Sequence, residues 1–293
     1  MPNNINYATL FESELLQKYK RELLTDSLTT HNVRFTGANT IRVPNMALAG
    51  YKDHGRNGGF NRQNVNTTYM PFTLAHDRDV EFFVDVMDVD ESNQAASAAN
   101  LTNTFEAEHA IPETDCYRIS KLYADFIAAG GTASATALTE ANILSVFDDM
   151  MLEMDDNEVP YDGRILYVTP GVENLLKNTG AISRTSIVDT ATGAIKRTPA
   201  SLDDVQILKI PSNRMKTAYD FTDGCQAAAG AKQINMILAQ PKSVIACDKH
   251  SYIKLWEPGT HTQGDGYLYQ NRKYGDLFLL PNRAKGVALN ITN

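Results

Sequence analysis

A chain of 293 residues is long enough to bury a sizeable core, and a content of 43 % hydrophobic and 21 % charged residues is ordinary for a globular protein. The net charge of −8 argues against a nucleic-acid binder that works through a general positive field, and no apolar run is long enough to span a bilayer. No secretory signal follows Met1, and three widely spaced cysteines fit neither a disulfide framework nor a zinc site, which indicates folding in a reducing cytoplasm.

Residues 8–25 are predicted to form an amphipathic helix. Its apolar side chains fall on one stripe at helical spacing: Phe11, Leu15, Tyr19 and Leu23. The segment precedes every other element and belongs to no obvious core. We therefore expect an N-terminal arm that lies on a neighbouring molecule.

Two segments with strict period-two alternation, 33–43 and 72–86, predict a long β-hairpin. The stretch between them, 44–70, is rich in Gly and Asn, has no periodicity and carries three basic residues near its tip, Lys52, Arg56 and Arg62. An isolated two-stranded ribbon is only marginally stable in water. We therefore expect another copy of the chain to supply the burial that the hairpin lacks.

A helical pattern then runs from residue 92 to residue 128. A continuous helix of this length measures roughly 50 Å at about 1.5 Å per residue, which is long for a domain of this size. Proline lacks a backbone N–H and crowds the preceding turn, so Pro112 is expected to mark a bend or a restart. The small residues of 130–137 predict a linker and the best internal domain boundary.

The remainder of the chain predicts an α+β unit. A helix is expected over 139–154, a buried strand over 164–168 and a second helix from Pro170 to about residue 178. The polar stretch 181–200 is predicted to be an exposed loop. The other strands are expected to be short, over 205–210, 234–238, 243–246, 252–256, 266–269, 276–280 and 285–291.

The sequence contains no complete catalytic, cofactor or metal motif. The glycine-rich stretch 55–59 lacks the spacing and the strand-to-helix context of a phosphate-binding loop, which favours a loop tip. The six histidines never occur as a close pair, as a zinc site would require. The paired acids at 148–149 and 155–156 are typical of a solvated helix face, and Cys116 and Cys247 are predicted to be buried. We predict no catalytic residue, no cofactor and no metal.

One electrostatic feature points to contacts between subunits. The segment 79–91 contains no basic residue. Its acidic residues include Asp79, Glu81, Asp85 and Asp88. The basic loop tip of one copy would complement this segment in another, because opposite charges set register and pairing specificity. The alternative is that both are solvated surfaces, and the sequence leaves the two interpretations open.

The order of these elements resembles that of the major capsid proteins of tailed bacteriophages, which have the Hong Kong 97 fold. The resemblance covers nearly the whole chain and depends on architecture: an N-terminal arm, an extended β-hairpin loop, a long spine helix, a small-residue linker and a helix–strand–helix unit. Residues 165–170, Ile-Leu-Tyr-Val-Thr-Pro, resemble the opening of the family's axial domain. Residues 269–277, Tyr-Gln-Asn-Arg-Lys-Tyr-Gly-Asp-Leu, resemble the closing strands that return to the spine.

The resemblance implies an α+β chain in four parts: an arm (1–32), an extended loop (33–90), a peripheral domain with the spine helix (91–136 with 251–293) and an axial domain (137–250). It implies assembly into pentamers and hexamers of an icosahedral shell that encloses double-stranded DNA without sequence-specific binding. The expected location is the virion, after assembly in the bacterial cytoplasm and without a membrane. Only the arm precedes the hairpin, so a separate scaffolding protein is expected as a partner, together with a portal.

Some members of this family join subunits through a Lys–Asn isopeptide bond. Lys52 stands in the corresponding loop, and Asn290 or Asn293 would be its partner. The reaction needs a desolvated, neutral lysine and a carboxylate base, and the polar surroundings of Lys52 argue against it.

Three other classes compete with a phage shell subunit. An encapsulin-like compartment protein shares the shell fold. A tail-tube protein is usually β-rich and lacks a spine helix, so the pattern over 92–128 argues against it. An enzyme is disfavoured because the sequence matches none of the catalytic motifs considered above.

Overall fold

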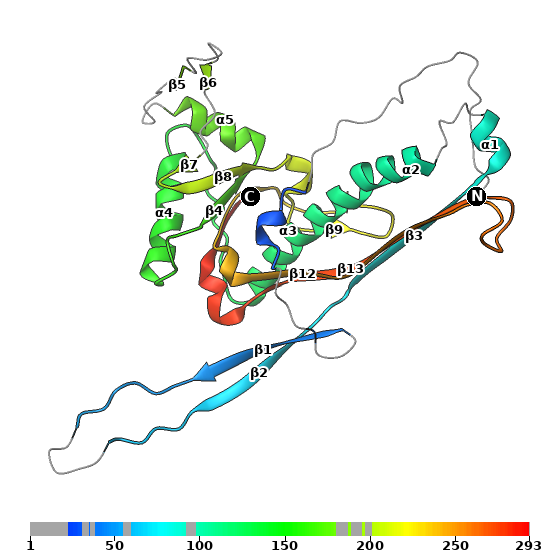
Figure 1. The fold of residues 1–293 in the computed structure, drawn as a ribbon. Coiled ribbons are helices and arrows are strands. Elements are labelled where there is room, and N and C mark those ends of the chain that lie inside the picture. Colours follow the sequence, from blue (N-terminus) through cyan, green and yellow to red (C-terminus); the bar gives the residue numbers. More distant parts are fainter. Residues whose placement is uncertain are drawn as a thin grey trace.

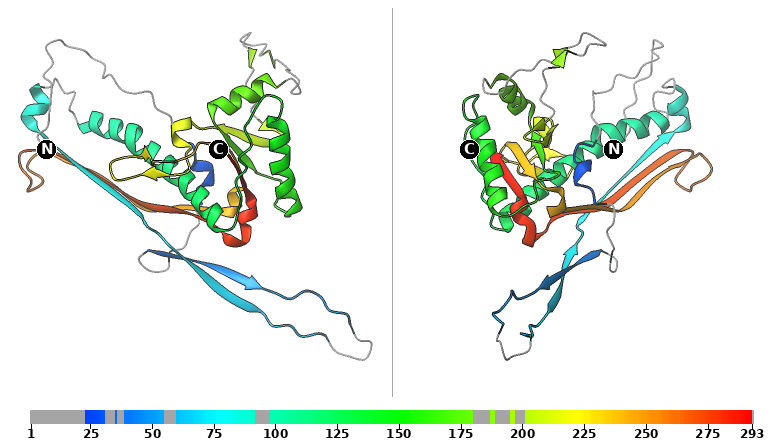
Figure 2. Two further views of the ribbon diagram at one scale, coloured as in Figure 1. Left: turned by 180° about the vertical axis from the view of Figure 1, so that it is seen from behind. Right: turned by 60° about the vertical axis from the view of Figure 1, so that its left-hand side comes forward.

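The structure is a computed structural model that describes residues 23–30, 35, 39–54, 60–91, 98–179, 187–188, 195–196 and 201–292. A mixed body contains a five-stranded sheet and a three-stranded sheet, with a long helix between them (Figure 1). A two-stranded hairpin projects from this body, and the view from behind shows it standing clear of the remaining elements (Figure 2). The predicted α+β class is thus the observed one.

The projecting hairpin consists of β1 (Thr40–Ala47) and β2 (Asn66–Thr73), which pair antiparallel from Thr40↔Thr73 to Ala47↔Asn66. The predicted hairpin of 33–43 with 72–86 is wrong in its bounds, because β1 and β2 extend into the stretch 44–70 that was expected to be a loop. Of the predicted first strand, residues 33–34 and 36–38 lie outside the described residues. The chain turns a corner at residues 74–75 and continues as β3 (His76–Asp85), which pairs with a strand of the body and not with β1. The period-two pattern runs through this corner, so it could not reveal the change of sheet.

The three-stranded sheet has the order β12-β13-β3 and is antiparallel throughout. Its long strands are β12 (Val244–Trp256) and β13 (Gly266–Leu279). The four short strands expected over 243–280 therefore merge into two. A bulge between Asp248 and His250 interrupts the pairing of β12 with β13, and this irregularity broke the pattern on which the prediction depended.

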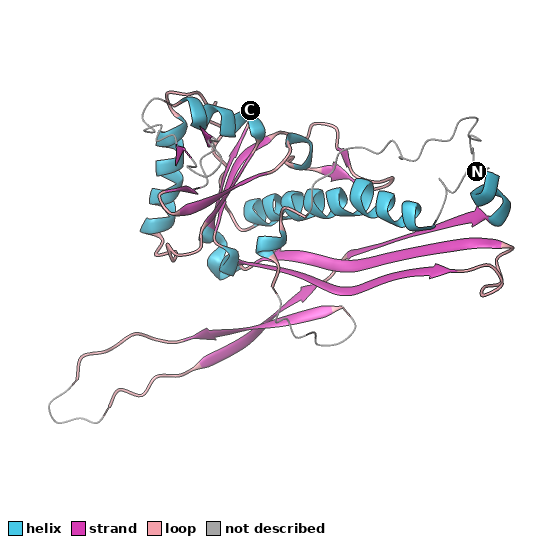
Figure 3. Ribbon diagram, turned by 45° about the horizontal axis from the view of Figure 1, so that its top comes forward, coloured by secondary structure: helices cyan, strands magenta, loops and turns pink. Residues whose placement is uncertain are grey.

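After β3 the chain forms α1 (Val86–Glu91), and the long helix is described from α2 (Ala98–Phe105) through a π-helical turn (Glu106–Ala110) to α3 (Ile111–Ala128). Pro112 lies in the first turn of α3, directly after the π-helical residues. The three segments continue along one rod (Figure 3). The restart predicted at Pro112 is thus a change of hydrogen-bonding register without a break in the helix.

The five-stranded sheet has the order β14-β11-β4-β8-β7 and holds two cores, one on each face. In its central strand β4 (Ile165–Val168), Leu166 and Val168 face α4 (Ile143–Asp156) and α5 (Pro170–Asn178), whereas Tyr167 packs with the apolar side of α3. The other strands are β7 (Ser201–Leu202), β8 (Val205–Lys209), β11 (Ile234–Ala239) and β14 (Val287–Ile291). The helices and strands predicted here are confirmed within a few residues.

Smaller elements complete the chain. A hairpin of β9 (Tyr219–Asp220) and β10 (Gln226–Ala227) packs on α3, and β5 (Ile187–Val188) pairs with β6 (Ile195–Lys196) inside the predicted loop. The predicted linker lies against β14, where the N–H of Ser134 bonds to the carbonyl of Leu289. The predicted helix over 8–25 falls largely outside the described residues, and its last three positions are not helical.

Buried charged side chains of α3 hold the N-terminal segment by hydrogen bonds and Arg214 by an ion pair. Asp115 accepts hydrogen bonds from the N–H of Thr25 at 3.1 Å, from the hydroxyl of Thr25 at 2.8 Å and from Arg214 Nη1 at 2.9 Å. Arg118, one turn further along the helix, donates to the carbonyl of Thr25 and to the hydroxyl of Thr29. Asp115, Arg118 and Arg214 are all buried, so each charge depends on these partners.

Asp115→Ala is expected to lower the free energy of unfolding by about 3–5 kcal/mol, because Arg214 is left buried without its partner. Asp77→Ala serves as the matched control, since the pair that Asp77 forms with Arg272 is largely exposed. Its expected loss is about 0–1 kcal/mol. Urea unfolding of the unassembled subunit measures both values, and equal losses in the two variants would contradict a structural role for the buried pair.

Candidate inter-subunit surface

The base of the projecting hairpin is anchored in a small core of its own. Ile41 and Leu74 are buried together with Phe278 and Cys247 of the body. One carboxylate fixes the corner between β2 and β3: Asp276 accepts from the N–H of Ala75 at 2.8 Å and from the hydroxyl of Tyr117 at 2.8 Å. The direction in which the hairpin leaves the body is therefore set at its base.

Beyond this base, large apolar side chains on the hairpin and its loop have no core to enter. Six are exposed: Met46, Leu48, Tyr51, Phe60, Val65 and Tyr69. Tyr51 is 108 % exposed and Phe60 is 95 % exposed, so neither gains burial within its own subunit. A row of exposed aromatic and aliphatic groups on a projecting element is typical of a protein–protein contact. These apolar groups were not predicted, because the loop was interpreted as polar.

Two of the three basic residues of the predicted loop tip lie within the described residues. Lys52 and Arg62 are exposed, and Arg56 lies outside the described residues. Near the tip, the side-chain amide of Asn61 donates to the carbonyl of Asp53 at 3.0 Å and links the two sides of the loop. Among the described residues, neither Lys52 nor Arg62 forms an ion pair with an acidic side chain.

The predicted acidic segment divides into two groups. Asp79 and Glu81 are exposed on the face of β3 that points away from the long helix. Asp85, the last residue of β3, and Asp88 in α1 are half-buried. On the neighbouring strand β13, Arg272 is in register with Asp79 and forms its ion pair with Asp77, and Gln270 donates to Glu81 at 2.7 Å. Arg272 and Gln270 lie about 190 residues from Asp79 and Glu81 in the sequence, so these neighbours were not predicted.

The basic tip and the acidic strand lie far apart in one subunit. The far end of the described part of the hairpin loop and the α1 end of β3 are at opposite extremes of the molecule in Figures 1 and 2. The structure thus does not bring the two predicted groups together within a chain, and any contact between them would have to join different copies.

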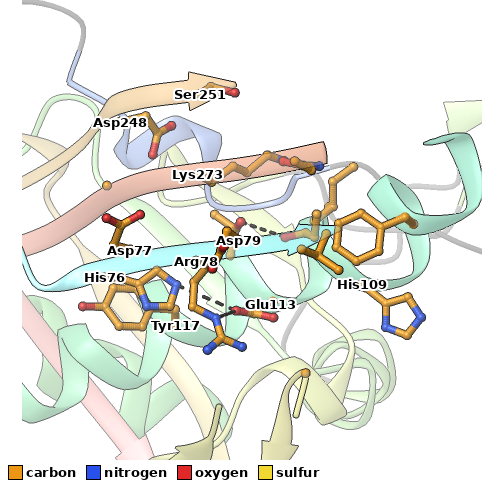
Figure 4. A pocket seen from close by; sticks show the side chains of 18 of the residues that line it. His76, Asp77, Arg78, Asp79, His109, Glu113, Tyr117, Asp248, Ser251 and Lys273 are labelled. Carbon is orange, nitrogen blue, oxygen red and sulfur yellow. Dashed lines mark hydrogen bonds and ion pairs between the residues drawn. The ribbon is translucent and has the colours of Figure 1, made fainter. Parts of the chain in front are cut away.

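A pocket of about 650 Å³ separates α3 from the three-stranded sheet, close to the hairpin base. His76 lies against Tyr117 with ring centroids 3.7 Å apart (Figure 4). Phe221 meets the imidazole edge-on at 5.7 Å. Arg78 Nε donates to Glu113 Oε1 at 2.7 Å, whereas His76 Nε2 stays 4.0 Å from the same oxygen. The contacts of His76 with Tyr117 and of Arg78 with Glu113 fasten β3 to the long helix.

Burial, with a smaller contribution from the Arg78 charge, lowers the pKa of His76 from 6.5 to about 4. The imidazole is therefore neutral at neutral pH. Burial and the Asp276 charge raise the pKa of the Tyr117 hydroxyl far above its ordinary value, so this group stays protonated as a donor. Neither group is an activated base or nucleophile, and the geometry is that of a structural joint.

The described residues contain no group of three or more His, Cys, Asp or Glu side chains arranged to hold a metal ion. Among the same residues, no helix has the length and apolar character needed to cross a membrane. Cys116 and Cys247 are buried, as predicted.

Asn290, a candidate partner for a Lys52 isopeptide bond, is inaccessible. It is 0 % exposed in β14, where its side chain accepts from Asn235 at 2.9 Å and donates to the carbonyl of Thr136 at 3.0 Å. A bond to Asn290 would require this part of the sheet to open. Asn293, the other candidate, lies outside the described residues.

His76→Phe is expected to reduce the acid sensitivity of the fold. A pKa that is lower in the folded state means that the unfolded chain binds more protons, so stability is lost as pH falls from about 6.5 towards about 4. Between about pH 7 and pH 4.5 the wild type should lose about 2–3 kcal/mol through this group, which the phenylalanine variant would retain. His109→Gln is the control, because His109 is exposed. Urea unfolding across this pH range measures the difference, and parallel curves for all three proteins would contradict it.

The chain resembles known proteins in structure and not in sequence. No protein-family model matches the chain, and no curated protein matches it in sequence. Solved phage structures do match. A chain from Mycobacterium phage Che8 is 16 % identical with a TM-score of 0.66, and the match covers 99 % of this chain and 98 % of that one.

Two capsid structures match over a similar extent. The bacteriophage PhiM1 mature capsid gives 14 % identity and a TM-score of 0.71, with 98 % of this chain and 92 % of that chain covered. The capsid of Cyanophage P-SCSP1u gives 13 % identity and a TM-score of 0.65, with 98 % and 93 % covered. At such low identity the comparison establishes the fold alone. The chain has, over nearly its whole length, the fold of phage capsid structures, and the resemblance predicted from the sequence is confirmed at that level.

Proposed function

We propose that this protein is a structural, non-enzymatic major capsid protein of a tailed phage. In this proposal it assembles into hexamers and pentamers of an icosahedral shell that encloses double-stranded DNA, with a scaffolding protein and a portal as partners. The observation that carries the proposal is the hairpin, whose exposed apolar side chains have no core in their own subunit. The match to phage capsid structures over 98–99 % of the chain supports it.

The division into parts follows the same proposal. The hairpin with its loop corresponds to the extended loop, and the rod from α2 to α3 corresponds to the spine helix. We place the three-stranded sheet beside the rod in the peripheral domain, which therefore takes β3 from the predicted loop (33–90) and residues 244–250 of β12 from the predicted axial domain (137–250). We place the five-stranded sheet with α4 and α5 in the axial domain, which the arrangement in Figure 3 supports because these elements gather at one end of the rod, and this sheet takes β14 from the predicted peripheral part (251–293).

An encapsulin-like compartment shell is the second candidate, because it would use the same projecting hairpin for the same burial. The two differ in cargo, which is DNA in one and protein in the other. A tail-tube protein is disfavoured by the long helical rod and by the capsid neighbours.

Electron microscopy of the purified protein tests the proposal together with a hairpin variant. The wild type is expected to form closed shells. Tyr51→Ala combined with Phe60→Ala should remain as small oligomers, because the apolar contact with the neighbour is lost. The unfolding free energy of the unassembled variant should stay within about 0.5 kcal/mol of the wild type, since both side chains are exposed.

Three results would contradict the proposal. Tubes from the wild type would favour a tail-tube protein, and discrete small oligomers from the wild type would show that the protein does not form a shell. Normal shells from the double variant would show that Tyr51 and Phe60 are not needed for the contact between subunits. Protease treatment adds a second readout, since cleavage within 48–65 should be fast in the unassembled subunit and slow in the shell.

Charge complementarity between the tip of one copy and the acidic strand of another is part of the proposal. Reversing Lys52, Arg56 and Arg62 to glutamate should impair assembly and leave the subunit folded. Each exposed pair contributes only about 0.2–1 kcal/mol, but the contacts recur many times in a closed shell. The control exchanges the same residues with retained charge, Lys52→Arg, Arg56→Lys and Arg62→Lys. Normal shells from the reversed variant at both low and high salt would exclude this pairing.

A further inference from the structure

The β9–β10 hairpin is held against the long helix by aromatic rings. Phe221, which follows β9, meets Tyr117 of α3 with ring centroids 5.7 Å apart, and Tyr219 lies 6.1 Å from Phe221. The hydroxyl of Tyr219 accepts from the N–H of Lys216 and donates to the carbonyl of Asn213, which fixes the ring within its own loop. This hairpin therefore has a defined position on α3.

Two cysteines occupy the two sides of this contact. Cys116 directly precedes Tyr117 on the helix and is 3 % exposed. In the hairpin Asp220 pairs with Gln226, so one step further along the same register places Cys225 across from Phe221. The thiol of Cys225 interacts with that of Cys116, which also interacts with Tyr219, and both cysteines are free.

We propose that Cys116 and Cys225 are a redox pair that closes to an intramolecular disulfide bond when the folded protein meets an oxidant of the disulfide or diazene class. The two S–H bonds break and one S–S bond forms. The two protons and two electrons pass to the oxidant, which is reduced to two thiols in the first case and to a hydrazine in the second. The bond would tie the β9–β10 hairpin covalently to the long helix.

The surroundings of the pair determine its order of reaction. Cys225 is partly exposed and meets the oxidant first, whereas the buried Cys116 displaces the mixed adduct and completes the bond. Contact with Cys116 and burial raise the pKa of the Cys225 thiol, so little thiolate is present at neutral pH and closure is slow. If the proposed function holds, closure follows release of the particle from the reducing cytoplasm.

The test uses the full-length folded protein. Treatment with the diazene oxidant diamide, alkylation with N-ethylmaleimide and non-reducing peptide mass spectrometry should reveal a linked pair of peptides that contain Cys116 and Cys225. Two of the three thiols should be lost, with Cys247 still alkylated, because it belongs to the separate cluster at the hairpin base. The apparent melting temperature should rise and should return to its original value after dithiothreitol.

Two variants sharpen the result. Cys225→Ser should retain both remaining thiols after diamide and show no melting shift, whereas Cys247→Ala should still form the linked peptides. The proposal is overturned if Cys116 and Cys225 are each alkylated in the oxidised wild type. It is also overturned if the link joins Cys247 or a second copy, or if Cys225→Ser shows the same melting shift. These measurements do not depend on assembly, so their outcome is separate from that of the proposed function.

Discussion

The carboxylate of Asp276 is the contact on which the arrangement of the other parts depends. Asp276 lies on β13 and is 5 % exposed. Its carboxylate accepts hydrogen bonds from the N–H of Ala75 at the corner of the hairpin and from the hydroxyl of Tyr117 on the long helix. Three segments that are far apart in the sequence therefore meet at one buried side chain. Because a buried carboxylate is costly unless its oxygens are hydrogen-bonded, this contact specifies one geometry for hairpin, helix and sheet together.

The sequence was most informative where the burial pattern is local. The helix over Ile143–Asp156 and the strand over Ile165–Val168 each carry an uninterrupted apolar pattern within their own segment, and both were predicted within a few residues. Prediction failed where pairing is distant. The corner at residues 74–75 preserves the alternation of side chains while the strand changes partner from β1 to β13, and only the position of β13 distinguishes the two.

The candidate surface shows the same limit. Exposure of Lys52 and Arg62 follows from a loop without apolar periodicity. The sequence could not show that Arg272 lies opposite Asp79, because the pair is created by the register of two distant strands. Tyr51 and Phe60 are aromatic residues in a segment for which no core was predicted, and this could have indicated a contact with another subunit. A single aromatic residue in a polar loop forms no periodic pattern, however, so its burial or exposure could not be predicted.

The hairpin also acts as a lever. Some sixteen residues separate Thr40 from the middle of the loop, and an extended chain of that length reaches at most about 55 Å. A rotation of about 5° at the base then moves the tip by about 5 Å, which is the spacing between neighbouring β-strands. The angular stiffness of the corner at residues 74–75 therefore determines how accurately a distant tip is placed, and small mechanical differences at the base are magnified into large differences in where the tip arrives.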